Sequence, residues 1–251
     1  MAKKSYQTII LKIGSSTLTS PAGKLDLANL KRIVSEVAAL VKAGKKVMIV
    51  TSGAIVTGSE KLGMGKPRTI PEKQAAAAVG QSLLMRQYDK AFEEFGITIA
   101  QILLTRDAIN TNAKNCLMTL LKGSVVPIIN ENDTVAVDEI KIGDNDNLAA
   151  LTAGMIGADA LIILTDIDGF YMKNEEGIPY LAAEINKITQ EVKDAAGHPS
   201  TQLGTGGMIT KIQAAEICLK AGIELQIING RRPGLITEAA AGNRVGTRFV
   251  V

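Results

Sequence analysis

The chain has 251 residues, and its 46% of hydrophobic and 21% of charged residues are typical of a globular α/β domain with a sizeable core. Lys and Arg number 28 against 25 Asp and Glu, and the net charge of +3 is too small to indicate a nucleic-acid surface. A single histidine, His198, excludes a histidine-based metal cage.

No segment of the sequence is typical of export or of a membrane. The first residues, Met-Ala-Lys-Lys-Ser-Tyr, contain no apolar signal core, and no run approaches the ~20 apolar residues of a membrane span. The two cysteines, Cys116 and Cys218, lie far apart in helical patterns, which we interpret as buried reduced thiols. We expect a cytoplasmic protein that binds neither membrane nor nucleic acid.

Short apolar runs alternate with longer helical patterns, which indicates a mainly parallel sheet with crossover helices on both faces, a three-layer αβα sandwich. Strands are predicted over 7–13, 46–50, 98–104, 125–129, 160–164 and 224–228, with a last one at Phe249. Helices are predicted over 27–41, 71–95, 111–122, 148–156, 208–220 and 235–240.

Boundary signals support several of these helices. Asp26 is a predicted N-cap, Pro71 suits a first turn, and Gly44 and Gly96 follow helix ends. Alternation over 134–142 predicts an antiparallel hairpin arm, and the polar stretch 173–202 is the segment expected to be most flexible. No linker or repeat divides the chain, so we predict one domain.

The densest polar cluster follows the predicted strand 125–129. Asn-Glu-Asn-Asp at 130–133 and Gly-Asp-Asn-Asp-Asn at 143–147 place carboxylates and carboxamides near one strand end. Crowded carboxylates repel one another by about a kcal/mol per close pair even in water. The cluster therefore predicts a small-molecule site that cations enter, and Lys12 and Lys211 are the candidates.

Two glycine turns follow the first two predicted strands. Lys12 ends the first strand just before Gly14, at the edge where open α/β sheets bind ligands, and its ammonium suits a phosphate. An edge-strand lysine that faces solvent is the alternative. Thr51-Ser52-Gly53-Ala54 repeats the arrangement, and its backbone N–H groups could approach an anion, although such turns often only connect two elements.

A third glycine turn, Gly204-Thr205-Gly206-Gly207, opens the predicted helix that carries Lys211 in its first turn. The glycines would let the backbone wrap phosphate oxygens, and the helix end adds partial positive charge. The spacing is neither a Walker A loop nor the Rossmann fingerprint. A flexible loop before an ordinary helix is the alternative.

Thr165 and Asp166 follow the buried strand 160–164 and are placed to bind ribose or base edges. Asp168-Gly169, directly after them, reads equally well as a turn that reverses the chain.

In this order, the motifs resemble those of the catalytic domain of the glutamate 5-kinases, in the amino-acid kinase superfamily. The matching segments are 12–16, 52–54, 73–75, 79–81, 130–133, 143–147, 165–166 and 205–208 with Lys211. The two Asp/Asn motifs are the specific part, because sister kinases for acetylglutamate, aspartate, uridylate or carbamate share the glycine turns but differ at the acceptor site. Many members continue into a PUA domain, which we expect this chain to lack.

The resemblance implies an amino-acid kinase fold over 1–251, with glutamate bound by the N-terminal part and ATP by the part from about residue 160. It implies ATP-dependent phosphorylation of the γ-carboxylate of L-glutamate to L-glutamyl 5-phosphate, the first step toward proline. Mg²⁺ would arrive with the nucleotide, without a metal cage of protein ligands. L-proline is the implied feedback inhibitor, and the implied assembly is a homo-oligomer, a dimer or a tetramer.

Residue by residue, the resemblance implies that Lys12 and Lys211 neutralise the transferring phosphoryl group and that Asp146 holds both lysines. The implied glutamate-binding residues are Ser52, Gly53, Asn130, Asp133, Asp144 and Asn145. The implied ATP-binding residues are Lys12, Gly14, Thr165, Asp166, Thr205, Gly206, Gly207, Met208, Ile209, Thr210 and Lys211.

The chemistry agrees with this assignment, because a carboxylate nucleophile is already ionised at pH 7 and needs no general base. Another acyl-phosphate kinase of the superfamily and a non-catalytic nucleotide and amino-acid sensor are the alternatives. The presence of both Lys12 and Lys211 favours an enzyme over a sensor, since a sensor needs affinity but no charge aimed at a moving phosphoryl group.

Overall fold

The computed structural model describes residues 5–135, 145–197 and 207–250. Eight strands form one sheet in the order β3-β4-β2-β1-β5-β9-β10-β8. Their bounds are β1 Thr8–Ile13, β2 Lys46–Thr51, β3 Ile99–Leu104, β4 Val126–Glu131, β5 Ala160–Thr165, β8 Glu184–Ile185, β9 Glu224–Asn229 and β10 Thr247–Phe249. The pairs from β3 to β9 are parallel, and β10 runs antiparallel to β9. The predicted mainly parallel sheet is confirmed.

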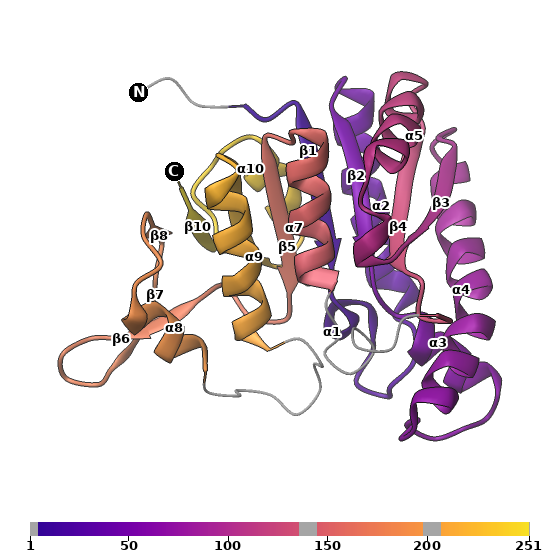
Figure 1. Cartoon of the computed structure of the whole chain (residues 1–251), viewed down its shortest axis with the longest axis horizontal. Helices are drawn as coiled ribbons and strands as arrows, with labels where there is room; N and C mark the ends of the chain where they lie inside the picture. Colours follow the sequence, from indigo (N-terminus) through magenta and orange to yellow (C-terminus); the bar gives the residue numbers. More distant parts are fainter. Residues whose placement is uncertain (1–4, 136–144, 198–206, 251) are drawn as a thin grey trace.

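Helices cover both faces of this sheet, which confirms the three-layer sandwich (Figure 1). One layer holds α5 (Thr111–Lys122), α7 (Asn145–Ile156), α8 (Gln190–Ala196) and α9 (Met208–Lys220). The opposite layer holds α2 (Leu27–Lys42), α4 (Ile70–Glu93) and α10 (Leu235–Ala240). The short helices α1 (Ser15–Leu18) and α3 (Ala54–Lys61) follow β1 and β2, and the 3-10 turn η1 (Arg106–Ala108) follows β3.

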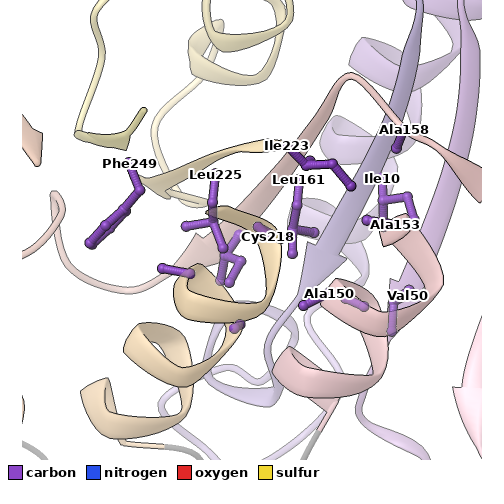
Figure 2. Close-up of a cluster of buried hydrophobic side chains, with 14 of the residues drawn as sticks. Ile10, Val50, Ala150, Ala153, Ala158, Leu161, Cys218, Ile223, Leu225 and Phe249 are labelled. Atoms are coloured by element: carbon purple, nitrogen blue, oxygen red, sulfur yellow. The ribbon is translucent and has the colours of Figure 1, made fainter. Parts of the chain in front are cut away.

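The alternation of side chains along β1 decides which layer each residue meets. Ile9 and Leu11 pack against the α2 and α4 layer, whereas Ile10 belongs to the core under α7 and α9. Figure 2 shows Ile10 near Ala150 and Ala153 of α7. Lys12 has the same parity as Ile10 and therefore points toward the α7 and α9 layer. Because β1 is central, the alternative of a solvent-facing edge lysine is wrong for Lys12.

The capping signals are confirmed. The Asp26 carboxylate accepts from the N–H of Asn29 at the start of α2, and Gly44 after its end has a φ of 82°. Thr69 and Glu72 form a capping box at the start of α4, with Pro71 in its first turn.

Two local predictions differ from the structure. The helix predicted from 148 begins at Asn145, because Asn and Asp suit a first turn, where exposed N–H groups need acceptors. The described part of the polar stretch 173–202 contains β7 (Pro179–Leu181), β8 and α8, and β7 pairs with β6 (Tyr171–Lys173); the flexibility expected of this stretch stays a prediction. Cys116 is exposed, since the buried stripe of α5 is Leu117 and Leu121; only Cys218 is a buried thiol.

The predicted hairpin arm over 134–142 lies mostly outside the described residues. Its first two residues, Thr134 and Val135, form part of a turn.

Candidate active site

The candidate site lies at the carboxyl edge of the sheet, beside β1 and β5. In the sheet, β2 lies beside β1 on one side, and β9, the next parallel strand of the chain at this sheet position, lies beside β5 on the other. A crevice is expected where neighbouring strands connect in opposite directions. The first turns of α7 and α9 lie together at this edge, where Asp146 of α7 contacts Thr210 and Lys211 of α9 (Figure 1).

Lys12, Lys211 and Asp146 meet at this edge. The Lys12 Nζ lies 2.7 Å from Asp146 Oδ1, and the Lys211 Nζ lies 3.3 Å from Asp146 Oδ2. Thr210 donates a hydrogen bond of 2.7 Å to Oδ2. All four residues are buried, with exposed fractions of 0% for Asp146, 5% for Lys12 and 7% for Lys211. The three charges sum to +1, so the cluster suits an added anion.

The carboxyl group of Asp146 stays ionised in this cluster. Burial alone would favour its neutral form, but the ammonium groups of Lys12 and Lys211 hold its pKa well below the usual range. Asp146 also lies in the first turn of α7, where the helix dipole favours a negative charge. The carboxylate therefore fixes two lysines that would otherwise repel each other.

Gly14 leaves space directly beside the Lys12 ammonium. A Cβ added to Gly14 would lie 3.6 Å from the Lys12 Nζ and 3.4 Å from the carbonyl oxygen of Leu164. Any side chain here would occupy the approach to the ammonium. The glycine turn therefore fits an anion such as a phosphate next to Lys12.

A relay of carboxamides lies at the ends of β2 and β4. Asn145 Nδ2 donates to the Thr51 carbonyl oxygen at 2.9 Å, to Ser52 Oγ at 3.0 Å and to Asn130 Oδ1 at 3.0 Å. Asn130 Nδ2 donates in turn to Gln81 Oε1 at 2.9 Å. The amide hydrogens of Asn145 are thus used inside the protein, and its Oδ1 is buried without a partner among the described residues.

Asp133 lies two residues after β4 and is half-buried. Burial raises its pKa to about 6, and no ion-pair partner of Asp133 is found in the part of the chain that the structure describes. A carboxylate held in this way can accept a cationic group from a ligand. Ser52 and Gly53, which also belong to the predicted glutamate site, are half-buried between β2 and α3.

On the other side of β1, Thr165 ends β5 and donates to Asp166 Oδ1 at 3.2 Å, while Asp166 is half-buried. Asp168 instead accepts from Asn229 at 2.9 Å and pairs with Arg232 at 2.9 Å, which agrees with its reading as a turn residue.

At the start of α9 the structure describes part of the predicted nucleotide-binding turn. Gly207 is its N-cap, Met208 is half-buried, and Ile209 is 47% exposed. The predicted site residues Asp144, Thr205 and Gly206 lie outside the described residues.

Two further residues hold the site, and the sequence predicts no role for either. Gln81 lies in the motif 79–81 of the family resemblance, and in the structure it extends the carboxamide relay. Arg231, after β9, donates to the carbonyl oxygens of Ser16 at 2.8 Å and Thr19 at 2.7 Å, and so fixes the turn after β1. The adjacent pair of arginines 231–232 resembles an ordinary solvated pair in the sequence.

Within residues 5–135, 145–197 and 207–250, no group of three His, Cys, Asp or Glu side chains is arranged to hold a metal ion. The same residues include no helix that is long and apolar enough to span a membrane.

Comparisons with known proteins show the family of the chain. The family model described as "Amino acid kinase family" matches residues 7–229. Over 96% of its length the chain is 49% identical to a "Glutamate 5-kinase" of Thermoanaerobacter sp. (strain X514), of which it covers 67%. It is 45% identical to a "Glutamate 5-kinase" of Clostridium tetani (strain Massachusetts / E88), with 98% of this chain and 95% of the relative covered.

Among solved structures, a UMP kinase from Bacillus anthracis matches with a TM-score of 0.66 and 14% identity, over 98% of this chain and 97% of that one. At this identity, the likeness concerns the fold alone.

Proposed function

The chain belongs to the glutamate 5-kinases of the amino acid kinase family, and we propose that it phosphorylates the γ-carboxylate of L-glutamate with ATP. The product would be L-glutamyl 5-phosphate, at the first step of proline biosynthesis. The observation that carries this proposal within the site is the buried cluster of Lys12, Asp146 and Lys211, with its net positive charge.

The transfer needs charge stabilisation and alignment more than acid–base chemistry. A γ-carboxylate oxygen of glutamate forms a bond to the γ-phosphorus of ATP while the bond to the β,γ-bridging oxygen breaks, which releases ADP. The nucleophile carries no proton at pH 7, so no base is required. Lys12 and Lys211 would neutralise the negative charge shared among the phosphoryl oxygens, and Asp146 would keep both ammonium groups in place.

Glutamate would lie near the ends of β2 and β4. Asp133 suits the α-ammonium because it is a half-buried carboxylate. Ser52, Gly53, Asn130 and Asn145 would shape this pocket, and Asp144 is proposed for it from the family motif alone. The carboxamide relay would hold the pocket rigid, so that little ordering remains when glutamate binds.

ATP would lie across β1 and β5. Gly14 leaves room for phosphate oxygens beside Lys12, and Thr165 with Asp166 lies at the β5 end, where ribose or base edges could bind. The turn from Thr205 to Lys211 would wrap the phosphates, with Gly207, Met208, Ile209 and Thr210 supplying its described part. Mg²⁺ carried by the nucleotide would neutralise further phosphate charge.

Incubation with ATP, Mg²⁺ and L-glutamate, with hydroxylamine to trap the acyl phosphate, tests the proposal. We expect glutamyl hydroxamate in amounts that match the ADP released. A panel with aspartate, acetylglutamate, carbamate and UMP separates the other kinases of the superfamily. Binding of ATP and glutamate without any ADP release would indicate a sensor instead.

We also propose that L-proline inhibits by occupying the glutamate site, since it has the cyclised carbon skeleton of glutamate. Inhibition should then diminish as glutamate approaches saturation, and inhibition that persists there would indicate a separate site. A homo-oligomer, a cytoplasmic location and a single domain over 1–251 remain predictions, and light scattering combined with size-exclusion chromatography tests the first.

A further inference from the structure

Two backbone groups fix the orientation of every carboxamide in the relay. Asn130 Oδ1 accepts from the N–H of Glu131 at 2.9 Å, so its Nδ2 must be the atom that faces Gln81. Asn145 Nδ2 donates to the carbonyl oxygen of Thr51, which fixes that amide too. Because Asn130 offers a donor to Gln81, the Gln81 oxygen takes this bond and its Nε2 is directed elsewhere.

The Nε2 of Gln81 is a buried donor that lacks a partner among the described residues. The whole side chain is 9% exposed. A buried donor without a partner loses its hydrogen bonds to water and gains none in return, so a site that retains one is suited to a ligand that supplies the acceptor.

The backbone beside Gln81 cannot shift easily. Helices α3 and α4 cross at Gly58 and Gly80, where a Cβ on either glycine would lie 1.8 Å from a carbonyl oxygen of the other helix. Gln81 follows Gly80 directly, so this close crossing sets the height of its side chain above the sheet. The donor is therefore held in place before any ligand arrives.

Gln81 and Asp133 line the same small hollow, together with Ala54, Ala77 and Leu103. The hollow is thus lined by the residue that carries the buried N–H donor and by a residue that carries a carboxylate. An α-amino acid presents the complementary pair on one carbon, a carboxylate and an ammonium group.

We propose that Gln81 is a specificity-determining residue of the acceptor site, whose Nε2 donates to the α-carboxylate of the amino-acid substrate while Asp133 binds its α-ammonium. This inference rests on the proposed function, because it assigns a contact to the same acceptor. Gln81 would select substrates with an α-carboxylate and take no part in the phosphoryl transfer itself.

Two glutamate analogues separate the two contacts. Glutarate keeps both carboxylates and lacks the ammonium, whereas 4-aminobutyrate keeps the ammonium and one carboxylate but lacks the α-carboxylate. Their dissociation constants are measured by competition calorimetry against L-glutamate. Binding is measured without ATP, so the result does not depend on turnover, and glutamyl hydroxamate formation by the wild type is assayed separately as the test of the proposed function.

For Gln81→Met we expect about ten-fold or greater weakening of glutarate and glutamate, the scale of a hydrogen bond to a charged group, with 4-aminobutyrate changed less than two-fold. Asp133→Asn should show the reverse, weakening 4-aminobutyrate and sparing glutarate. Gln87→Met, in the same helix α4, is the matched control and should change neither.

Gln81→Glu adds a readout that a merely structural role would not move. Its carboxylate keeps the acceptor for Asn130 but replaces the free donor with a charged acceptor, so glutarate should bind far more weakly at pH 8. Relative to wild type, binding should partly recover toward pH 5, as protonation restores an O–H donor. Equal weakening of both analogues in Gln81→Met, or no weakening of glutarate, would overturn the assignment.

Discussion

The Lys12 Nζ lies 2.7 Å from the Asp146 carboxylate, and the two residues come from the central strand β1 and the first turn of α7. Both groups are buried, and Asp146 contacts Lys211 with its other oxygen. One carboxylate thus holds two positive charges close together in a region of low dielectric. A negatively charged transition state would strengthen this arrangement, because it supplies the balancing charge.

Replacing either lysine by methionine keeps most of the volume and removes the charge. We expect Lys12→Met and Lys211→Met each to lower kcat by about 10²-fold or more, the scale of losing one preorganised donor. Lys193→Met, which removes an exposed ion pair with Glu216, is the control and should leave kcat unchanged. Wild-type kcat in either active-site variant would exclude a catalytic role for that lysine.

Asp146→Asn keeps an oxygen for Thr210 but no longer balances the two ammonium groups. We expect a large loss of kcat with a less than three-fold change in KM for glutamate, because Asp146 contacts lysines and no substrate in this proposal. Since the pKa of Asp146 is held below its usual range, the ratio of wild-type to variant kcat should stay constant from pH 6 to 9. Steady-state kinetics over that range decides the point.

Asp133→Asn should stabilise the ligand-free protein and weaken glutamate binding. Burial raises the pKa of Asp133 to about 6. Above that pH the folded protein holds a carboxylate that is better solvated in the unfolded chain, and this charge lowers the free energy of unfolding. The gain in melting temperature should be present at pH 7.5 and should disappear toward pH 4, where Asp133 is protonated in the folded protein. A lower melting temperature for the variant at pH 7.5 would contradict this reasoning.

Gly80→Ala should strongly destabilise the protein, because its Cβ would lie 1.8 Å from the Ala54 carbonyl oxygen in a tight helix crossing. We expect a loss of about 3 kcal/mol or more in the free energy of unfolding, beyond ordinary overpacking. Gly65→Ala is the matched control, since nothing lies within 4 Å of its added Cβ. Urea denaturation of both variants measures the difference.

Arg231→Ala should act on the turn after β1, because Arg231 donates to the carbonyl oxygens of Ser16 and Thr19. We expect a rise of several-fold in KM for ATP, with KM for glutamate unchanged and partial rescue in Arg231→Lys. Arg244→Ala removes an exposed ion pair with Glu184 and serves as the control. An equal rise in both Michaelis constants would point to general loss of structure instead.

Much of the fold follows from local patterns in the sequence. The buried strands of the parallel sheet are continuous apolar runs, and Asp26 and Pro71 mark helix starts as capping chemistry requires. Helix α7 begins three residues before the predicted start, because Asn145, Asp146 and Asn147 are residue types common in loops. In the structure they form the first turn of the helix, and Asp146 is buried there by its contacts with Lys12 and Lys211.

The sequence by itself identified Lys12, Asp146 and Lys211 as candidates for the chemistry, since each lies in a motif near a strand end or a helix start. Only the tertiary structure decided which groups touch. The parity of β1 turns Lys12 toward α7, and the close crossing at Gly58 and Gly80 sets Gln81 against Asn130. The physical reason is that hydrophobic pattern and capping act over a few residues, whereas the partner of a buried charge or amide is fixed by the packing of distant elements.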